Sequence, residues 1–173
     1  MEKKLFILIG IFWLIIIIGF IAIKEFTLQT GKEVLLKTVP VDPRDLFRGD
    51  YVILAYEIST IDLNSIWANY TNFKFGDKIY VVLKEEKGYA IPSKIYRDIP
   101  KHESLFLKGT VKYVRAKNLT VEYGIESYFV PEGKGKEIER ARGKTLDVKV
   151  SIDKYGKAVI KSLLMDGQEI RFK

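Results

Sequence analysis

The 173-residue sequence contains no cysteine and only one histidine, His102. The absence of cysteine excludes disulfide bonds, thiolate nucleophiles, iron–sulfur clusters and cysteine-ligated zinc. A single histidine excludes a metal site built on a histidine pair and disfavours a histidine-based proton relay. The sequence also lacks the glycine-rich nucleotide-binding motifs and the GxSxG motif of serine hydrolases. We therefore expect neither a cofactor nor a metal site.

The chain carries only a mild excess of one charge. Lysine and arginine number 29 and aspartate and glutamate 22, which gives a net charge of +7, and the excess is spread along the sequence. Nucleic-acid-binding proteins usually gather their basic residues into a patch or stripe, so we expect no nucleic-acid partner. Hydrophobic residues make up 47% of the chain, which is enough for a packed core and excludes a disordered protein.

Much of this apolar content lies in one uncharged run of 19 residues, Leu5–Ile23. As a helix the run is roughly 28 Å long, close to the thickness of the hydrocarbon core of a bilayer. A buried core helix would show a polar face, and this run has none. The run is longer than the apolar region of a cleavable signal peptide, and no pair of small residues marks a cleavage site. The sequence therefore predicts an uncleaved signal anchor that spans the membrane.

The charges that flank this run predict its orientation. Lys3 and Lys4 precede the span, whereas Lys24 follows it beside the acidic Glu25. The positive-inside rule then favours a cytoplasmic N-terminus and an extracytoplasmic C-terminal domain of a single-pass protein in the cell membrane. We expect an anchor over residues 1–24, a short tether over 25–33 and one β domain over 34–173.

Beyond the anchor, short runs of β-branched and aromatic residues alternate with turn residues. Such spacing predicts a mostly β domain, an antiparallel barrel or sandwich, with one short helix at Lys136–Arg142. Asp62–Asn69 is interpreted as a short helix or an irregular loop. The expected strands are Val34–Val39, Tyr51–Ile58, Ile79–Leu83, Tyr89–Tyr96, Leu105–Val114, Leu119–Tyr123, Ser127–Val130, Leu146–Ile152, Lys157–Leu164 and Gln168–Phe172.

Charged residues are densest in a nine-residue segment that we name the Asp/Arg loop, which contains Asp42, Arg44, Asp45, Arg48 and Asp50. Three carboxylates and two guanidinium groups can form paired hydrogen bonds that fix an irregular loop, so a structural brace is the favoured interpretation. The alternative is an anion or peptide pocket lined by the two arginines. Acid/base catalysis is disfavoured because neighbouring arginines keep carboxylates ionised.

The strand that follows this loop has one face suited to a core. Strict alternation places Val52, Leu54 and Tyr56 on the same face. If that face is buried, the hydroxyl group of Tyr56 needs a hydrogen-bond partner.

A second polar set occupies the Tyr123–Glu132 segment and consists of Tyr123, Glu126, Tyr128 and Glu132. The simpler interpretation is a corner between a strand and the expected short helix. The more specific hypothesis is that this corner meets the Asp/Arg loop in one polar network, with Glu126 and Glu132 as partners for Arg44 or Arg48.

These residues carry a resemblance to a known family. Gly49–Tyr56 reads GDYVILAY and fits the pattern G-D-Y-x-x-L-x-Y at every fixed position. The sequence resembles the GDYXXLXY-motif family in this block, in Asp42–Asp45 with Arg48, and in the later Tyr123–Glu126 and Tyr128–Gly133. The resemblance implies a membrane-anchored prokaryotic protein, sometimes accompanied by multispanning membrane proteins. It implies no catalytic residues.

Two classes of function remain at this stage. The favoured hypothesis is a non-catalytic binding or accessory domain that acts with a multispanning membrane protein or an envelope component. The alternative is a membrane-tethered hydrolase or transferase that uses carboxylates of the Asp/Arg loop and of the Tyr123–Glu132 segment.

Overall fold

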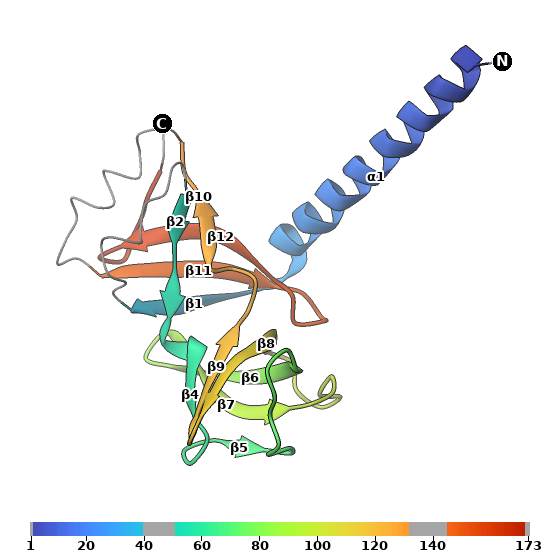
Figure 1. The fold of residues 1–173 in the computed structure, drawn as a ribbon. Helices are drawn as coiled ribbons and strands as arrows, with labels where there is room; N and C mark the ends of the chain where they lie inside the picture. The colour runs from blue at the N-terminus through green and yellow to red at the C-terminus, as the bar shows by residue number, and fades with distance from the viewer. Residues whose placement is uncertain (1, 40–50, 132–144, 172–173) are drawn as a thin grey trace.

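The computed structural model describes residues 2–39, 51–131 and 145–171. A long N-terminal helix leads into a β domain with two main layers (Figure 1). The elements are α1 (Glu2–Thr30), β1 (Lys32–Val39), β2 (Tyr51–Ile53), β3 (Ala55–Tyr56), the 3₁₀ turn η1 (Glu57–Ser59), β4 (Thr60–Asp62), β5 (Trp67–Ala68), β6 (Lys78–Glu86), β7 (Tyr89–Tyr96), β8 (Phe106–Arg115), β9 (Asn118–Glu122), β10 (Ser127–Phe129), β11 (Leu146–Ile152), β12 (Ala158–Met165) and β13 (Gln168–Glu169).

Helix α1 extends well beyond the uncharged run. It covers 29 residues, a length of about 44 Å, and continues through Lys24 to Thr30. No glycine or proline interrupts residues 24–30, and the side chain of Gln29 donates to that of Glu25 one turn earlier at 2.7 Å. Gly31 alone separates the helix from β1. The segment expected to form a tether is therefore mainly helix.

The first layer is a sheet with the strand order β13-β12-β11-β1-β3, and its strands pair antiparallel. Its two hairpins follow from turn residues that tolerate positive φ. Asp166 and Gly167 have φ values of +49° and +79° between β12 and β13, as expected for an Asp-Gly hairpin turn.

The second layer is a sheet with the order β4-β9-β8-β6-β7-β5. Its pairs are antiparallel except for β5 and β7, which run parallel. Lys87 and Gly88, with φ values of +52° and +84°, form the turn between β6 and β7. The segment Asp62–Asn69, interpreted as a helix or an irregular loop, contains a turn followed by the two-residue strand β5.

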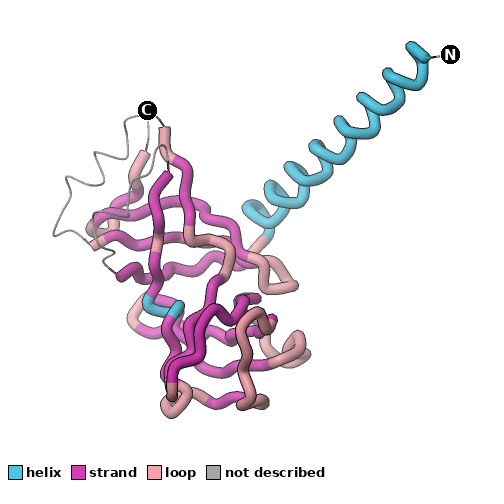
Figure 2. Tube along the Cα trace, in the orientation of Figure 1, coloured by secondary structure: helices cyan, strands magenta, loops and turns pink. Residues whose placement is uncertain are grey.

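The stretch from Tyr51 to Asp62 connects both layers. The sequence predicts one strand over Tyr51–Ile58, but the chain pairs with three different strands in turn. Strand β2 pairs with β10, β3 pairs with β1, and β4 pairs with β9. Between the last two, η1 lies at the junction of the layers (Figure 2). The sequence does not show where one short strand ends and the next begins, because each of them buries apolar side chains and the apolar pattern continues without a break.

The two layers share one hydrophobic core. No closed barrel forms among the described strands, and the domain is a sandwich-like, mostly β fold, which confirms the expected fold class. The short helix expected at Lys136–Arg142 lies outside the described residues. The largest fully buried side chains are those of Tyr56, Leu36, Ile58, Ile79, Ile95, Leu107, Leu119 and Leu163.

Candidate functional site

The residues selected from the sequence divide into two groups. Tyr56, Tyr123, Glu126 and Tyr128 belong to the part of the chain that the structure describes. The Asp/Arg loop with Asp42, Arg44, Asp45, Arg48 and Asp50 lies outside the described residues, and so does Glu132. A network that joins the Asp/Arg loop to the Tyr123–Glu132 segment therefore stays a prediction.

Strands β2 and β10 bring the GDYVILAY block and the Tyr123–Glu132 segment together. Ser127 pairs with Ile53 and Tyr128 with Val52 in an antiparallel ladder. Just beyond the ladder, the main-chain N–H of Leu54 donates to the carbonyl oxygen of Glu126 at 2.8 Å. Residues 51–54 of the GDYVILAY block and residues 126–129 of the Tyr123–Glu132 segment are thus direct neighbours.

Two buried tyrosines join the same blocks through their hydroxyl groups. Tyr56, 1% exposed, donates to the carbonyl oxygen of Ile125 at 2.5 Å. Tyr123, 7% exposed, donates to the carbonyl oxygen of Ile58 at 2.7 Å. Burial is the main cause that raises the pKa of both phenols far above its usual range, and the charge of Glu126 adds to it. Both hydroxyl groups therefore stay protonated at neutral pH and act as hydrogen-bond donors.

The carboxylate of Glu126 is engaged by the main chain. One oxygen accepts the N–H of Tyr123 at 2.6 Å, and the other accepts the N–H of Gly124 at 2.8 Å. Gly124 has a φ of +81°, a conformation that favours glycine. Because each carboxylate oxygen accepts one main-chain N–H, the side chain of Glu126 fixes the turn at Tyr123 and Gly124.

Strand β10 presents alternate residues to the surface. Tyr128 is half-buried and packs against the core cluster, whereas its neighbour Phe129 is 77% exposed. Tyr128 therefore helps to pack β10 on the domain.

A polar cluster that sequence reasoning missed lies where β1, β7 and β11 meet. Asp147 is 2% exposed, and its Oδ2 accepts the hydroxyl hydrogen of Tyr89 at 2.8 Å. This hydrogen bond is the main cause that raises the pKa of Tyr89. Lys37 and Glu57 form an ion pair of 2.7 Å nearby. Alternation along Leu146–Ile152 places Asp147 opposite the apolar positions, so no sequence signal predicts its burial.

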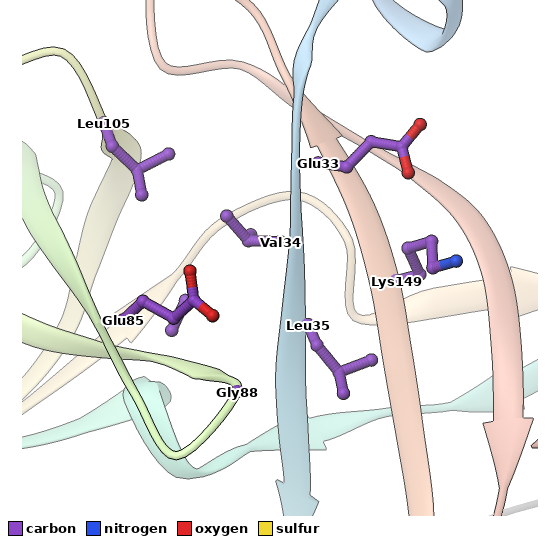
Figure 3. A pocket seen from close by; sticks show the side chains of 8 residues that line it. Glu33, Val34, Leu35, Glu85, Gly88, Leu105 and Lys149 are labelled. Carbon is purple, nitrogen blue, oxygen red and sulfur yellow. The ribbon is translucent and has the colours of Figure 1, made fainter. Parts of the chain in front are cut away.

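The structure contains a small hollow between β1 and the β6–β7 hairpin (Figure 3). Its volume is about 160 Å³, below the several hundred Å³ of most small-molecule sites. Val34 and Glu85 face it, whereas the side chains of Glu33 and Lys149 lie on the other side of β1. The acidic side chains beside this hollow therefore do not converge on one point.

Possible metal ligands are not grouped in the described ranges. Residues 2–39, 51–131 and 145–171 contain no cluster of three or more histidine, aspartate or glutamate side chains that could hold a metal ion. The polar contacts of Tyr56, Tyr123 and Glu126 join strands and turns of the domain to one another.

Comparison with known proteins gives one match. The model of the family described as "GDYXXLXY protein" matches residues 13–163, which include α1 from Trp13 onward and every strand from β1 to β11, with most of β12. No match was found among curated proteins or among solved structures.

Proposed function

Because the chain belongs to the GDYXXLXY protein family, we propose that it is a membrane-anchored, extracytoplasmic, non-catalytic binding or accessory domain of a prokaryotic cell. In this proposal the domain acts together with a multispanning membrane protein or an envelope component. The observation that carries the proposal is the surface of α1.

Among the described residues, no other element packs on the apolar run of α1. Residues 3–30 form a helix that is long and apolar enough to cross a membrane. Between Leu5 and Ile23 every large apolar side chain except that of Ile16 is about half exposed or more, for example Leu5 at 61%, Trp13 at 58% and Ile23 at 61%. An apolar surface of this size is costly in water and is stabilised by a lipid bilayer. Lys3 and Lys4 before the span support a cytoplasmic N-terminus.

The polar geometry favours binding over catalysis. Both oxygens of Glu126 accept main-chain N–H groups, and the phenols of Tyr56 and Tyr123 are buried donors to carbonyl groups. A general acid instead needs a raised carboxyl pKa in an apolar cleft beside the substrate. These contacts support an accessory domain whose polar groups hold its shape.

Topology is tested by fusions after Lys173. A reporter that is active only outside the cytoplasm should be active, and a cytoplasmic reporter should be silent. The matched control replaces Lys3 and Lys4 by glutamate, which should reduce the preference for this orientation. Release of the protein from membranes by alkaline carbonate would contradict the anchor, and an active cytoplasmic reporter would contradict the orientation.

The accessory role is tested by crosslinking in the native membrane. The chain has no cysteine, so Trp67→Cys and Phe75→Cys each give one unique attachment point on an exposed side chain. We expect a specific membrane or envelope protein to crosslink from one position and not from the other. Turnover in a panel of hydrolase and transferase substrates that is lost in Glu126→Gln would instead favour the enzymatic alternative.

A further inference from the structure

The base of α1 is fixed to the end of strand β11. Thr27 is 5% exposed, and its carbonyl oxygen accepts the hydroxyl hydrogen of Ser151 at 2.6 Å and the N–H of Gly31 at 2.9 Å. A Cβ on Gly31 would lie 2.4 Å from the Oγ of Ser151 and 2.9 Å from the carbonyl oxygen of Ile152. The base of the helix and the end of the sheet are therefore packed so closely that no side chain fits between them at Gly31.

This junction lies at the depth of the lipid headgroups when α1 spans a bilayer. The uncharged run ends at Ile23, and Thr27 follows four residues later, about 6 Å further along the helix. The headgroup layer on each side of the hydrocarbon core is about 5–7 Å thick. Because Ser151 bonds to Thr27, the end of β11 is held within or beside this layer.

The turn between β11 and β12, residues 153–157, begins directly after this contact and lies beside the base of α1 (Figure 1). Its shape is fixed from within, because one carboxylate oxygen of Asp153 accepts the N–H of Tyr155 at 2.8 Å and of Lys157 at 2.9 Å. It is also fixed from outside, because the carbonyl oxygen of Gly156 accepts the N–H of Lys108 at 2.8 Å. We name this element the 153–157 turn.

The exposed side chains of the 153–157 turn have the chemistry of a membrane interface. Tyr155 is 53% exposed, and the ammonium group of Lys154 lies 5.1 Å from the centre of its ring. Lys154 and Lys157 are exposed and form no ion pair with any carboxylate among the described residues. Tyrosine and lysine are the residues that favour the headgroup region and anionic lipids.

We propose that the 153–157 turn docks on anionic lipid headgroups of the membrane that α1 spans, an inference that rests on the proposed function. Lys154 and Lys157 contact the phosphate groups, and Tyr155 lies between them at the interface. Each lysine near an anionic surface contributes about 1 kcal/mol, or about fivefold, so the pair favours the docked state by roughly thirtyfold over a neutral membrane.

The test uses the full chain in lipid nanodiscs and a water-soluble reagent that acylates lysine. Modification is followed at each lysine by mass spectrometry, in discs of phosphatidylcholine alone and in discs with phosphatidylglycerol. We expect Lys154 and Lys157 to react at least fivefold more slowly in the anionic discs. Lys117, in the β8–β9 turn at the end of the domain away from α1 (Figure 1), should react equally in both. High salt should remove the protection because it screens the attraction.

Charge reversal separates docking from a general effect of the anionic surface on lysine reactivity. Lys157→Glu should lose most of the protection of Lys154, whereas the matched Lys117→Glu should leave it unchanged. Equal reaction of Lys154, Lys157 and Lys117 in both kinds of disc would overturn the docking proposal alone. Failure of the chain to enter the discs would instead count against the membrane anchor, and therefore against the proposed function itself.

Discussion

Tyr56 and Tyr123 form a reciprocal pair of hydrogen bonds: the hydroxyl group of each donates to the carbonyl oxygen two residues beyond the other tyrosine. Tyr56 reaches Ile125, and Tyr123 reaches Ile58. All four residues are buried, so neither carbonyl oxygen has water as an alternative partner. The two bonds hold the motif strand and the Tyr123–Glu132 segment in register where the chain passes from one layer to the other.

Replacing either tyrosine by phenylalanine should destabilise the domain. Each change leaves a buried carbonyl oxygen without a donor, which typically costs about 1–3 kcal/mol of the free energy of unfolding. Denaturant unfolding of the full chain in detergent measures the loss. The control is Tyr113→Phe, because Tyr113 is 62% exposed, and it should change stability by less than about 0.5 kcal/mol. Unfolding curves of Tyr56→Phe and Tyr123→Phe that match the wild type would show that the reciprocal bonds contribute nothing.

The same tyrosines predict an alkaline limit to stability. Burial raises the pKa of both phenols in the folded chain above the value of about 10 that tyrosine has when unfolded. Their stabilisation is therefore complete below pH 10 and is lost as the pH rises above it. Each buried phenol lowers the free energy of unfolding by about 1.4 kcal/mol per pH unit in that range.

Denaturant midpoints between pH 8 and pH 11 measure this decline. Tyr123→Phe should decline less steeply than the wild type above pH 10, since one phenol no longer titrates. A variant that keeps the wild-type slope would refute the assignment of the decline to this tyrosine.

Glu126 is predicted to act on stability through the turn that it closes. Glu126→Ala removes the acceptor of the N–H groups of Tyr123 and Gly124 and should cost about 1–3 kcal/mol. Glu126→Gln keeps one acceptor oxygen and should cost less. The pair is compared by thermal unfolding in detergent. Equal melting temperatures for Glu126→Ala and the wild type would mean that the carboxylate does not support the turn.

Gly31→Ala should loosen the contact between α1 and β11. The added methyl group would overlap the Oγ of Ser151, and overpacking of this kind costs about 1–3 kcal/mol. Limited trypsin digestion in detergent should then cleave after Lys32 roughly tenfold faster. Gly19→Ala is the matched control, since a Cβ there meets no other atom within 4 Å. Identical digestion of the two variants would argue against a tight junction.

The sequence predicts elements well where one uninterrupted strand ends at a turn. The expected bounds of Tyr89–Tyr96 and Leu146–Ile152 are those of β7 and β11. The core face of Val52, Leu54 and Tyr56 is also as expected, with exposures of 0%, 3% and 1%. The alternation of apolar residues and the identity of the turn residues are sufficient to predict these features, because the features depend on residues that are close in the sequence.

Features that depend on distant neighbours were not predictable. The division of Tyr51–Asp62 follows from three different partner strands, and the burial of Asp147 follows from the hydroxyl group of Tyr89, 58 residues away. The sequence required a partner for the hydroxyl of Tyr56 but could not identify the carbonyl oxygen of Ile125. The role of the Asp/Arg loop stays a prediction because the loop lies outside the described residues.

The junction at Gly31 also fixes the angle at which the β domain is turned about the axis of α1. Each residue of an α-helix turns the chain by about 100° and advances it by about 1.5 Å. One residue inserted between Lys24 and Thr27 would therefore turn the whole domain by about 100° around the helix axis and move it only about 1.5 Å along that axis. A protein that contacts both the span and the domain would then lose one of its two surfaces, whereas a partner that contacts the domain alone would not.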